Sequence, residues 1–363
     1  ANTEVDANGT CSRVWTVWIP TAEVERVAPA QITSVELGMA VLGSLVDAAD
    51  ATAKLSPLVS AYRTWIQSQK TKVAALAGDR KETGKTLIAQ AEFAAQRIEA
   101  GIAALADPDV LESFKLANSC METAARRRSA ILNDIDPAKV DPPAWRPFQL
   151  AFMLTTLGGV AKPLHADRER VDLLFFPTGG GKTEAYLGLA AFTLVLRRLR
   201  HPGIRSAGVS VLMRYTLRLL TLDQLGRASG LICALELERE KRPEKLGDWP
   251  FEIGLWVGSA ATPNRMGHRG YTGPGKDDTA YIRTKRYNED SKRHPAPIPL
   301  ENCPWCGTQF RGGGKSFRMW PSETQPKDLS VRCVNRNCDF SGNRRLPIVA
   351  VDEPIYRRLP GFL

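Results

Sequence analysis

The sequence feature that most constrains the fold is a glycine-rich segment, Pro-Thr-Gly-Gly-Gly-Lys-Thr, at residues 177–183. It follows an apolar run at residues 171–176 and opens a helical pattern at residues 183–199. Glycines allow several backbone N–H groups to surround a phosphate, a lysine contacts the β- and γ-phosphates, and a threonine hydroxyl binds Mg²⁺. The following helix would point the positive end of its dipole at the phosphates. The segment therefore predicts a P-loop site for ATP and Mg²⁺.

Each position of this loop has a predicted task. The predicted nucleotide-binding residues of the loop are Thr178, Gly179, Gly180, Gly181, Lys182 and Thr183. Lys182 and Thr183 are the candidate catalytic residues, because they would hold the phosphate charge and the metal. The letters Gly-Lys-Thr also occur at residues 84–86, but there they follow a polar stretch rather than a strand. We interpret that second occurrence as a coincidence at the start of a helix.

Strand-like and helical segments alternate around the loop. A second apolar run at residues 209–213 is followed by a helical pattern to about residue 237, and a third run occupies residues 251–257. Strands that alternate with helices are typical of a parallel, doubly wound sheet covered by helices. The predicted fold class is therefore α/β for this part of the chain.

The region before the loop is predicted to be helical. Its first helix would place five apolar residues on one face, at Val35, Met39, Leu42, Val46 and Ala49. A second would carry Leu58, Tyr62 and Trp65 on one side. An alanine-rich third helix is expected at residues 86–105, and Asp107 with Pro108 has the composition of the start of a fourth. This pattern predicts a helical domain that supports structure or binds a partner.

Four cysteines have the spacing of a metal site. Cys303 and Cys306 form a C-x₂-C pair, and Cys333 and Cys338 follow 26 residues later. Two such pairs can complete a tetrahedron around Zn²⁺, and Gly307 suits the tight turn of the first pair. A disulfide pair or unrelated thiols are the alternatives. We predict a structural, non-catalytic Zn²⁺ in a zinc-ribbon-like insertion, because four cysteines leave no open coordination position.

The composition agrees with a nucleic-acid partner. The formal net charge is +10, with 49 Lys and Arg against 39 Asp and Glu, and such an excess suits a polyanion such as DNA. Four basic residues near the cysteines could contact DNA or form a solvated face, namely Arg311, Lys315, Arg318 and Arg332. The sequence has no run of eighteen apolar residues and no signal-peptide pattern, so we expect a soluble, cytoplasmic protein without a membrane partner.

The motifs around the loop resemble those of superfamily 2 helicases. Residues 177–185 are similar to motif I of that family, many members of which also lack the first glycine of the general P-loop pattern. Arg146 and Gln149 belong to a segment that looks like the Q motif, where the glutamine reads adenine. Arg214 and Thr216 lie in a segment similar to motif Ia. The resemblance implies that these two residues contact the nucleic-acid backbone.

Two longer segments of the sequence resemble one family more closely. Residues 175–189 and 211–221 resemble the large helicase-like subunit of DISARM antiphage defence systems. The likeness is clear over about residues 145–260 and looser through the cysteines and the helical region. It implies ATP-driven DNA handling and a companion subunit in a defence complex. It also implies that the chain is the N-terminal part of a larger protein.

The acidic pair that an ATPase needs has two interpretations. Asp352 and Glu353 follow an apolar run and could be this pair. In the resembling family a similar segment precedes a further strand, and the acidic box comes later. We therefore expect the box and a second RecA-like lobe after Leu363. The chain alone would then bind nucleotide poorly.

These patterns together predict an α/β chain whose RecA-like P-loop parallel sheet is preceded by an α-helical domain and followed by a zinc-ribbon-like insertion. The predicted parts are a β-like segment at 1–32, a helical domain at 33–136, a first RecA-like lobe at 137–260, a basic zinc-binding insertion at 261–345 and the start of a further strand at 346–363. The predicted function is an ATP-dependent DNA helicase or translocase in antiphage defence. A non-enzymatic nucleic-acid-binding scaffold with a vestigial P-loop, or a DNA motor of restriction type, are the alternatives.

Overall fold

The protein is described by a computed structural model that covers residues 2–16, 30–176, 179–214, 218–259 and 261–363. The chain divides into two compact units, Ala1–Ala30 and Gln31–Leu363. The second unit contains the long helices, the small parallel sheet and the four clustered cysteines.

The first unit contains a short hairpin. Strands β1 (Asn2–Val5) and β2 (Cys11–Trp15) pair antiparallel. The Asp6 carboxylate closes the turn by accepting hydrogen bonds from two backbone N–H groups, at 2.8 and 2.9 Å. The β-like segment predicted at residues 1–32 contains this hairpin, and residues 1 and 17–29 of that segment lie outside the described part of the chain.

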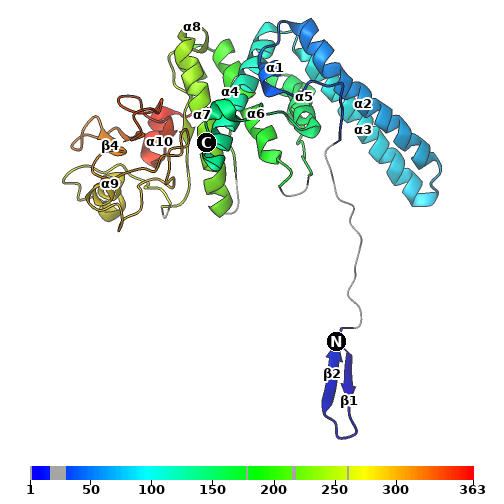
Figure 1. The fold of residues 1–363 in the computed structure, drawn as a ribbon, viewed down its shortest axis with the longest axis horizontal. Helices are drawn as coiled ribbons and strands as arrows, with labels where there is room; N and C mark the ends of the chain where they lie inside the picture. Colours follow the sequence, from blue (N-terminus) through cyan, green and yellow to red (C-terminus); the bar gives the residue numbers. More distant parts are fainter. Residues whose placement is uncertain (1, 17–29, 177–178, 215–217, 260) are drawn as a thin grey trace. The chain divides into compact units, whose positions relative to one another are not determined.

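Four helices form the start of the second unit (Figure 1). They are α1 (Met39–Gly43), α2 (Ala48–Ala74), α3 (Gly78–Ala104) and α4 (Pro108–Asn133). The predicted first helix with a single apolar face is wrong, because the chain leaves the helical conformation after Gly43 and Asp47 caps a new helix. Val46, expected on the apolar face, is 79% exposed in this break.

The helix starts that depend on local chemistry agree with the prediction. The Asp107 carboxylate accepts from the N–H groups of Asp109 and Val110, and Pro108 is the first residue of α4. The second Gly-Lys-Thr lies inside α3, where Lys85 pairs with Glu82 at 2.9 Å. It therefore belongs to a regular helix rather than to a phosphate loop.

The helices of the P-loop region pack directly on the first four. They are α5 (Pro147–Ala161), α6 (Lys182–Arg200), α7 (Arg218–Lys241) and the short α8 (Pro243–Leu246). Short 3₁₀ turns occupy Pro137–Lys139, Ala166–Glu169, Gly203–Ser206 and Lys276–Asp278. A Cβ at Gly101 of α3 would stand 1.8 Å from the carbonyl oxygen of Leu154, so α3 and α5 meet through a glycine.

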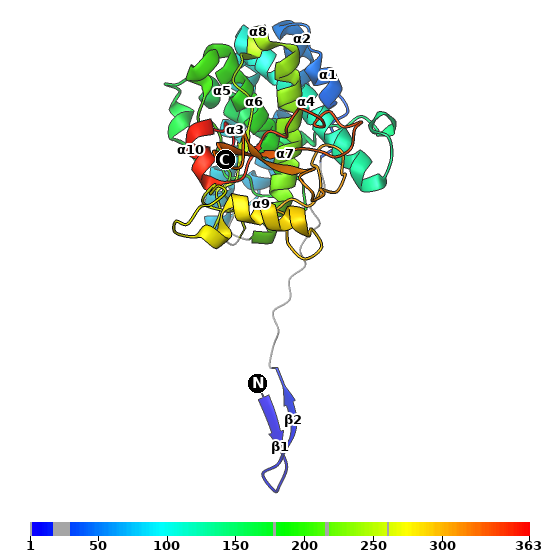
Figure 2. The same ribbon diagram turned by 90° about the vertical axis from the view of Figure 1, so that its left-hand side faces the viewer.

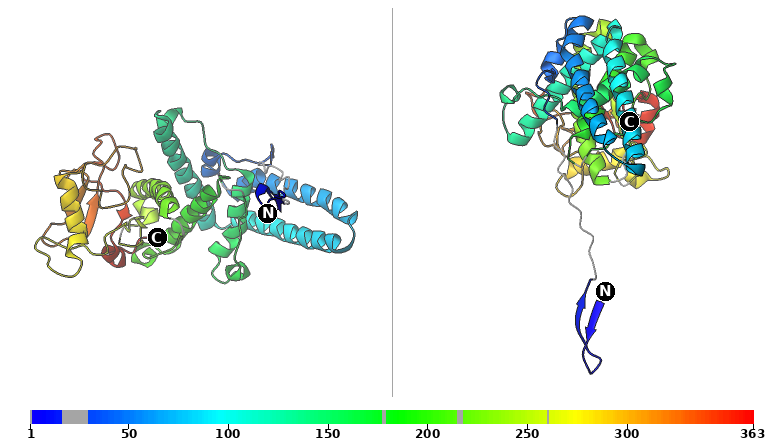
Figure 3. Two further views of the ribbon diagram at one scale, coloured as in Figure 1. Left: turned by 90° about the horizontal axis from the view of Figure 1, so that it is seen from below. Right: turned by 90° about the vertical axis from the view of Figure 1, so that its right-hand side faces the viewer.

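One hydrophobic core joins the helical region to the P-loop region. Its fully buried large side chains include Phe114, Trp145, Met153 and Phe192. The indole N–H of Trp145 donates to the buried Asn118 side chain of α4 at 2.7 Å, which satisfies both polar groups. Figure 3 shows α2 and α3 projecting from this core as a long antiparallel pair.

A small parallel sheet lies beside the helices. Strands β3 (Ile253–Gly254) and β6 (Ile348–Val349) pair in parallel. Phe362 forms parallel bridges to Ile253 on one side and to Val211 on the other. The order across this sheet is therefore Val211, Phe362, β3 and β6. Of the strand predicted at residues 251–257 only Ile253–Gly254 forms a strand, and the strand predicted at residues 209–213 is reduced to a single bridge at Val211.

The strand predicted at residues 171–176 is not part of this sheet in the described chain. Its Phe175 side chain is 90% exposed, and Val171 and Leu173 are also exposed. The segment is held against helices instead, because Asp172 forms an ion pair with Arg97 of α3. The physical reason for the departure is thus the single charge within the apolar run. A RecA-like sheet that includes this strand stays a prediction.

The cysteine module (residues 261–345) has little regular structure. It contains helix α9 (Ala280–Glu289) and an antiparallel hairpin of β4 (Phe317–Trp320) and β5 (Asp328–Val331). Helix α10 (Asp352–Arg358) follows β6. Figure 1 shows α9 and β4 close together at one side of the second unit, and Figure 2 shows that side facing the viewer, with α9 in yellow.

Candidate functional site

The glycine-rich loop ends at the start of α6 as the sequence predicts. Gly181 is the N-cap residue and has φ +88°, and Gly179 has φ +80°, both in the left-handed region that favours glycine. Lys182 and Thr183 are the first two residues of the helix and are partly buried. Thr178 lies outside the described residues. The N-terminus of a nineteen-residue helix thus stands directly behind the loop, as an anion site requires.

The upstream Arg146 and Gln149 contact this loop. The Gln149 amide donates to the Gly181 carbonyl oxygen at 2.7 Å, and the Arg146 guanidinium donates to the Gly180 carbonyl oxygen at 2.5 Å. The Gln149 oxygen accepts from the Arg146 N–H at 2.7 Å and caps α5. Two segments more than thirty residues apart therefore meet at the loop. Gln149 is 4% exposed and its amide is used by these contacts, so its reading of adenine stays a prediction.

Two further contacts hold the loop from its upstream side. The Lys182 ammonium donates to the carbonyl oxygen of Phe176. The Phe176 ring stacks on Phe148 of α5 with ring centroids 4.1 Å apart and planes 11° apart. Phe148 lies between the two predicted Q-motif residues. The sequence pattern gave no reason to single it out.

A charged pair links the loop helix to α7. Glu184, the third residue of α6, forms an ion pair with Arg227. Arg128 of α4 lies close by, and burial together with the Arg227 charge lowers its pKa. These groups line a cavity of about 410 Å³ between α4, α6, α7 and the cysteine module. Sequence reasoning missed the pair because its members are 43 residues apart and Arg227 lies in no recognised motif.

The predicted nucleic-acid contacts are only partly described. Arg214 is exposed just after the Val211 bridge, and Met213 donates its N–H to the Leu363 carbonyl oxygen at 2.7 Å. Arg214 therefore follows the carboxyl end of a parallel sheet position, where α/β folds place ligand contacts. Thr216 lies outside the described residues. The role of both residues in contacting nucleic acid stays a prediction.

The acidic pair begins helix α10 directly after β6. Glu353 accepts a hydrogen bond from the Met266 N–H at 2.9 Å and pairs with Arg357 at 2.9 Å. Burial raises the pKa of Asp352, and its Oδ1 atom has no hydrogen-bond partner among the described residues. Glu353 thus fixes the start of the cysteine module. The interpretation of the pair as the acidic box remains open.

The four cysteines of the module converge on one point. Their Sγ atoms all lie within 4.8 Å of one another, with Cys303 to Cys338 at 4.0 Å and Cys306 to Cys333 at 3.4 Å. Zn–S bonds of about 2.3 Å in a tetrahedron place sulfur atoms about 3.8 Å apart, so the donor set fits Zn²⁺. All four are free thiols, which excludes the disulfide alternative for this structure. These cysteines could hold a zinc ion.

The first pair forms a tight turn suited to a metal knuckle. Gly307 has φ +74° and donates its N–H to the Cys303 carbonyl oxygen at 2.9 Å. Hydrogen bonds among the thiols raise the pKa of Cys303 and lower that of Cys306. One thiolate is therefore favoured among neighbouring thiols, and a cation would favour ionisation of the others.

The module is anchored to the helices beside this turn. The Trp305 indole donates to Asp339 at 2.6 Å, and Arg127 of α4 lies 4.0 Å above its ring while pairing with Asp339 at 3.2 Å. Cys233 of α7 is fully buried nearby, and burial raises its thiol pKa well above the ordinary value. The cysteine cluster is thus packed against helices α4 and α7, which also lie beside the helix that follows the glycine-rich loop.

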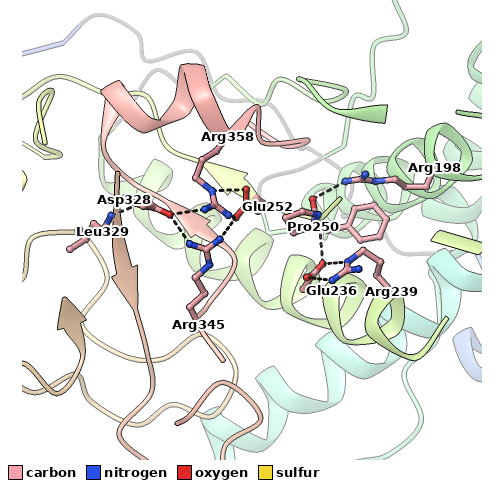
Figure 4. Close-up of polar contacts among 10 residues, drawn as sticks. Arg198, Glu236, Arg239, Pro250, Glu252, Asp328, Leu329, Arg345 and Arg358 are labelled. Carbon is pink, nitrogen blue, oxygen red and sulfur yellow. Dashed lines mark hydrogen bonds and ion pairs between the residues drawn. The ribbon is translucent and has the colours of Figure 1, made fainter. Parts of the chain in front are cut away.

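A buried charged network joins the module to the parallel sheet (Figure 4). Arg358 of α10 donates to Glu252, beside β3, at 3.0 Å and to Asp328 of β5 at 2.8 Å. Arg345 donates to the same Asp328 oxygen at 2.8 Å. Burial raises the pKa of both carboxyl groups. The two acids and two arginines balance in charge, which is the condition for burying them together.

The features described so far are a helix-rich chain, a glycine-rich loop before a long helix, and a cluster of four cysteines. The whole chain was compared with known proteins. No protein-family model matches it. Over 326 residues, 85% of the chain, it is 36% identical to the DISARM protein DrmA of Bacillus paralicheniformis. The chain spans 27% of the length of that protein. The chain is therefore similar to a DISARM protein over most of its length, in agreement with the resemblance of residues 175–189 and 211–221, whereas the superfamily 2 assignment stays a prediction.

Among the described helices, no segment combines the length and the apolar character that crossing a bilayer requires.

Proposed function

We propose that the chain is the nucleotide-binding part of an ATP-dependent DNA motor of superfamily 2 type that acts in antiphage defence. In this proposal Lys182 and Thr183 hold the phosphates and Mg²⁺, and Gly179–Gly181 form the cradle. Arg214 and Thr216 contact the DNA backbone. The similarity to a DISARM protein supports the defence role and a companion subunit, because DISARM is a multi-subunit system.

The observation that carries the proposal is the assembly around Gly181. The loop residue before the helix is left-handed, the helix N-terminus stands behind it, and Gln149 and Arg146 bind the loop carbonyls. Gln149 is a buried side chain from a segment more than thirty residues away, and it helps to fix this loop. The phosphates of bound ATP would lie close to the backbone N–H groups at the start of α6 and to the Lys182 ammonium, and both would stabilise their negative charge.

The test is ATP hydrolysis by the whole protein, with and without single- and double-stranded DNA. We expect Lys182→Ala to reduce DNA-stimulated turnover by about 100-fold or more, because it removes a cation from the phosphates. Lys85→Ala is the matched control, since Lys85 has the same Gly-Lys-Thr context but lies exposed within α3. It should keep full turnover.

One observation favours a second candidate, a scaffold with a vestigial P-loop. The segment before the loop is exposed and bound to Arg97 instead of lying in the sheet. A P-loop motor usually rests its loop on a central strand. Negligible turnover that is equal in the unchanged protein and in Lys182→Ala would reject the motor and favour the scaffold.

A further inference from the structure

Strand β4 of the cysteine module exposes alternate side chains to solvent, whereas all four residues of its partner β5 are buried. Along β4, Phe317 and Met319 are buried, whereas Arg318 and Trp320 are exposed, the latter by 48%. Arg318 stands opposite Ser330 of β5 in the register. Side chains two residues apart on a strand share a face and lie about 6.8 Å apart along it. A guanidinium and an indole therefore project side by side from the same face.

Three cations border a hollow beside this face. Lys315, Arg318 and Arg332 line a depression of about 350 Å³, and the described residues that line it include no carboxylate. Neutral groups orient the two guanidiniums. Arg332 donates to the carbonyl oxygen of Gly342 at 2.9 Å and to the Ser330 hydroxyl at 3.2 Å. Arg318 donates to the carbonyl oxygen of Gly314.

These three side chains form no ion pair in the part of the chain that the structure describes. Arg318 also borders a second hollow, whose lining includes Glu289 and Glu323. Asp328, which stands opposite Trp320 in the register, is 5% exposed and already shared by Arg345 and Arg358. The face therefore offers positive charge that forms no ion pair among the described residues, next to an exposed aromatic ring.

We propose that this face, defined by Lys315, Arg318, Trp320 and Arg332, binds single-stranded nucleic acid. The cations contact successive phosphates, and the Trp320 indole stacks on a base, which is the combination that sequence-tolerant single-strand sites use. The inference deepens the proposed function, on which it rests, by giving the cysteine module a share in holding the strand. It adds a site distinct from Arg214, which lies at the end of the parallel sheet.

The test is the affinity of the whole protein for fluorescent single-stranded DNA and RNA oligonucleotides and for duplex DNA, measured by anisotropy without nucleotide. We expect Lys315→Gln/Arg318→Gln to weaken single-strand binding by about tenfold and to lower the salt slope by about 1.4, because each phosphate contact contributes about 0.7. Trp320→Ala should weaken it by about fivefold or more without changing the slope. The DNA and RNA arms show which strand the face prefers.

Lys72→Gln/Arg80→Gln is the matched control, because it removes the same charge from exposed positions on α2 and α3. Equal unfolding midpoints of the two double variants ensure that binding alone is compared. The inference is overturned if the hairpin variant binds like the control, if Trp320→Ala binds like the unchanged protein, or if duplex binds more tightly than both single strands. A protein that binds through this face but hydrolyses no ATP would reject only the motor.

Discussion

At the scale of single residues, Gly181 and Gln149 define how the loop is built. Gly181 needs the left-handed backbone, and its carbonyl oxygen is bound by a buried amide from α5. A Cβ at Gly181 would stand 2.7 Å from the Gln149 nitrogen, whereas a Cβ at Gly179 would meet nothing within 4 Å among the described atoms. The two glycines thus share a backbone conformation and differ in their surroundings.

This difference gives a prediction for a pair of alanine variants. Both Gly179→Ala and Gly181→Ala should cost about 1–2 kcal/mol of local stability, because a side chain disfavours the left-handed conformation. Gly181→Ala should in addition displace Gln149 and weaken the binding of a fluorescent ADP analogue more strongly. Titration of the analogue into both variants checks this. Equal losses of affinity would show that the Gln149 contact does not shape the nucleotide site.

The residues of the loop could be predicted from sequence because their chemistry is local. Glycines before Lys-Thr are interpretable without any knowledge of distant contacts. The pair of Glu184 with Arg227 could not be predicted, since α6 and α7 had first to be packed together. The hydrogen bond from the Gln149 amide to the Gly181 carbonyl oxygen could not be predicted for the same reason.

At the scale of elements, the cysteine module depends on its four thiols for much of its order. Its regular structure is one helix of ten residues and a hairpin of two four-residue strands. Such a small module usually needs a metal or disulfides to stabilise it. The sulfur geometry supplies a closed set of four ligands, so the metal would act on stability rather than on catalysis.

We expect about one zinc ion per chain by elemental analysis. Cys306→Ser should lose the metal and lower the unfolding temperature by several degrees, because binding free energy is folding free energy in such sites. Cys11→Ser is the control, since Cys11 is an exposed free thiol of the first unit. Retention of zinc by Cys306→Ser would contradict the assignment of the four ligands.

Elements were predictable where a cap or spacing decided them. Asp107 with Pro108 fixed the start of α4, and the C-x₂-C pair with its distant partners indicated the thiol cluster. The apolar run at residues 171–176 misled, because Asp172 forms an ion pair with Arg97 of α3 and burial of the run is lost. The pattern of apolar residues did not indicate that Asp172 would form an ion pair with a residue of another helix.

At the scale of the whole second unit, the buried network of Arg358 connects parts that the sequence separates. It binds Glu252 beside β3 and Asp328 of β5, and both carboxylates are nearly inaccessible to solvent. Nothing in the sequence pairs these residues, which are 106 and 30 positions from Arg358. The network therefore belongs to the part of the fold that periodicity and motifs could not predict.

Removing the central cation should destabilise the fold strongly. We expect Arg358→Ala to cost about 3–5 kcal/mol at pH 7, because it leaves buried carboxylates undercompensated. The neighbouring Arg357→Ala should cost no more than about 0.5 kcal/mol, since its pair with Glu353 is exposed. Urea unfolding of both variants measures the difference. Equal costs would contradict a structural role for the network.

The cost of Arg358→Ala should also depend on pH. Burial raises the pKa of Glu252 and Asp328, so in the folded state each carboxyl group is easier to protonate than in the unfolded chain. A raised carboxyl pKa favours the fold below the unfolded pKa, and this benefit is lost as pH rises through the folded pKa. The destabilisation should therefore be smaller at pH 5 than at pH 7. The unfolding series repeated at both values checks the sign.

The same network sets an order for folding. Helices α2 and α3 are connected by a short loop and pack against each other, so they can form early and quickly. The carboxylate of Glu252 acquires its main cation only when a chain segment 106 residues later arrives. Closing such a long loop costs entropy before any contact repays it. During synthesis, the strands around Glu252 therefore reach their final packing only after Arg358 has left the ribosome.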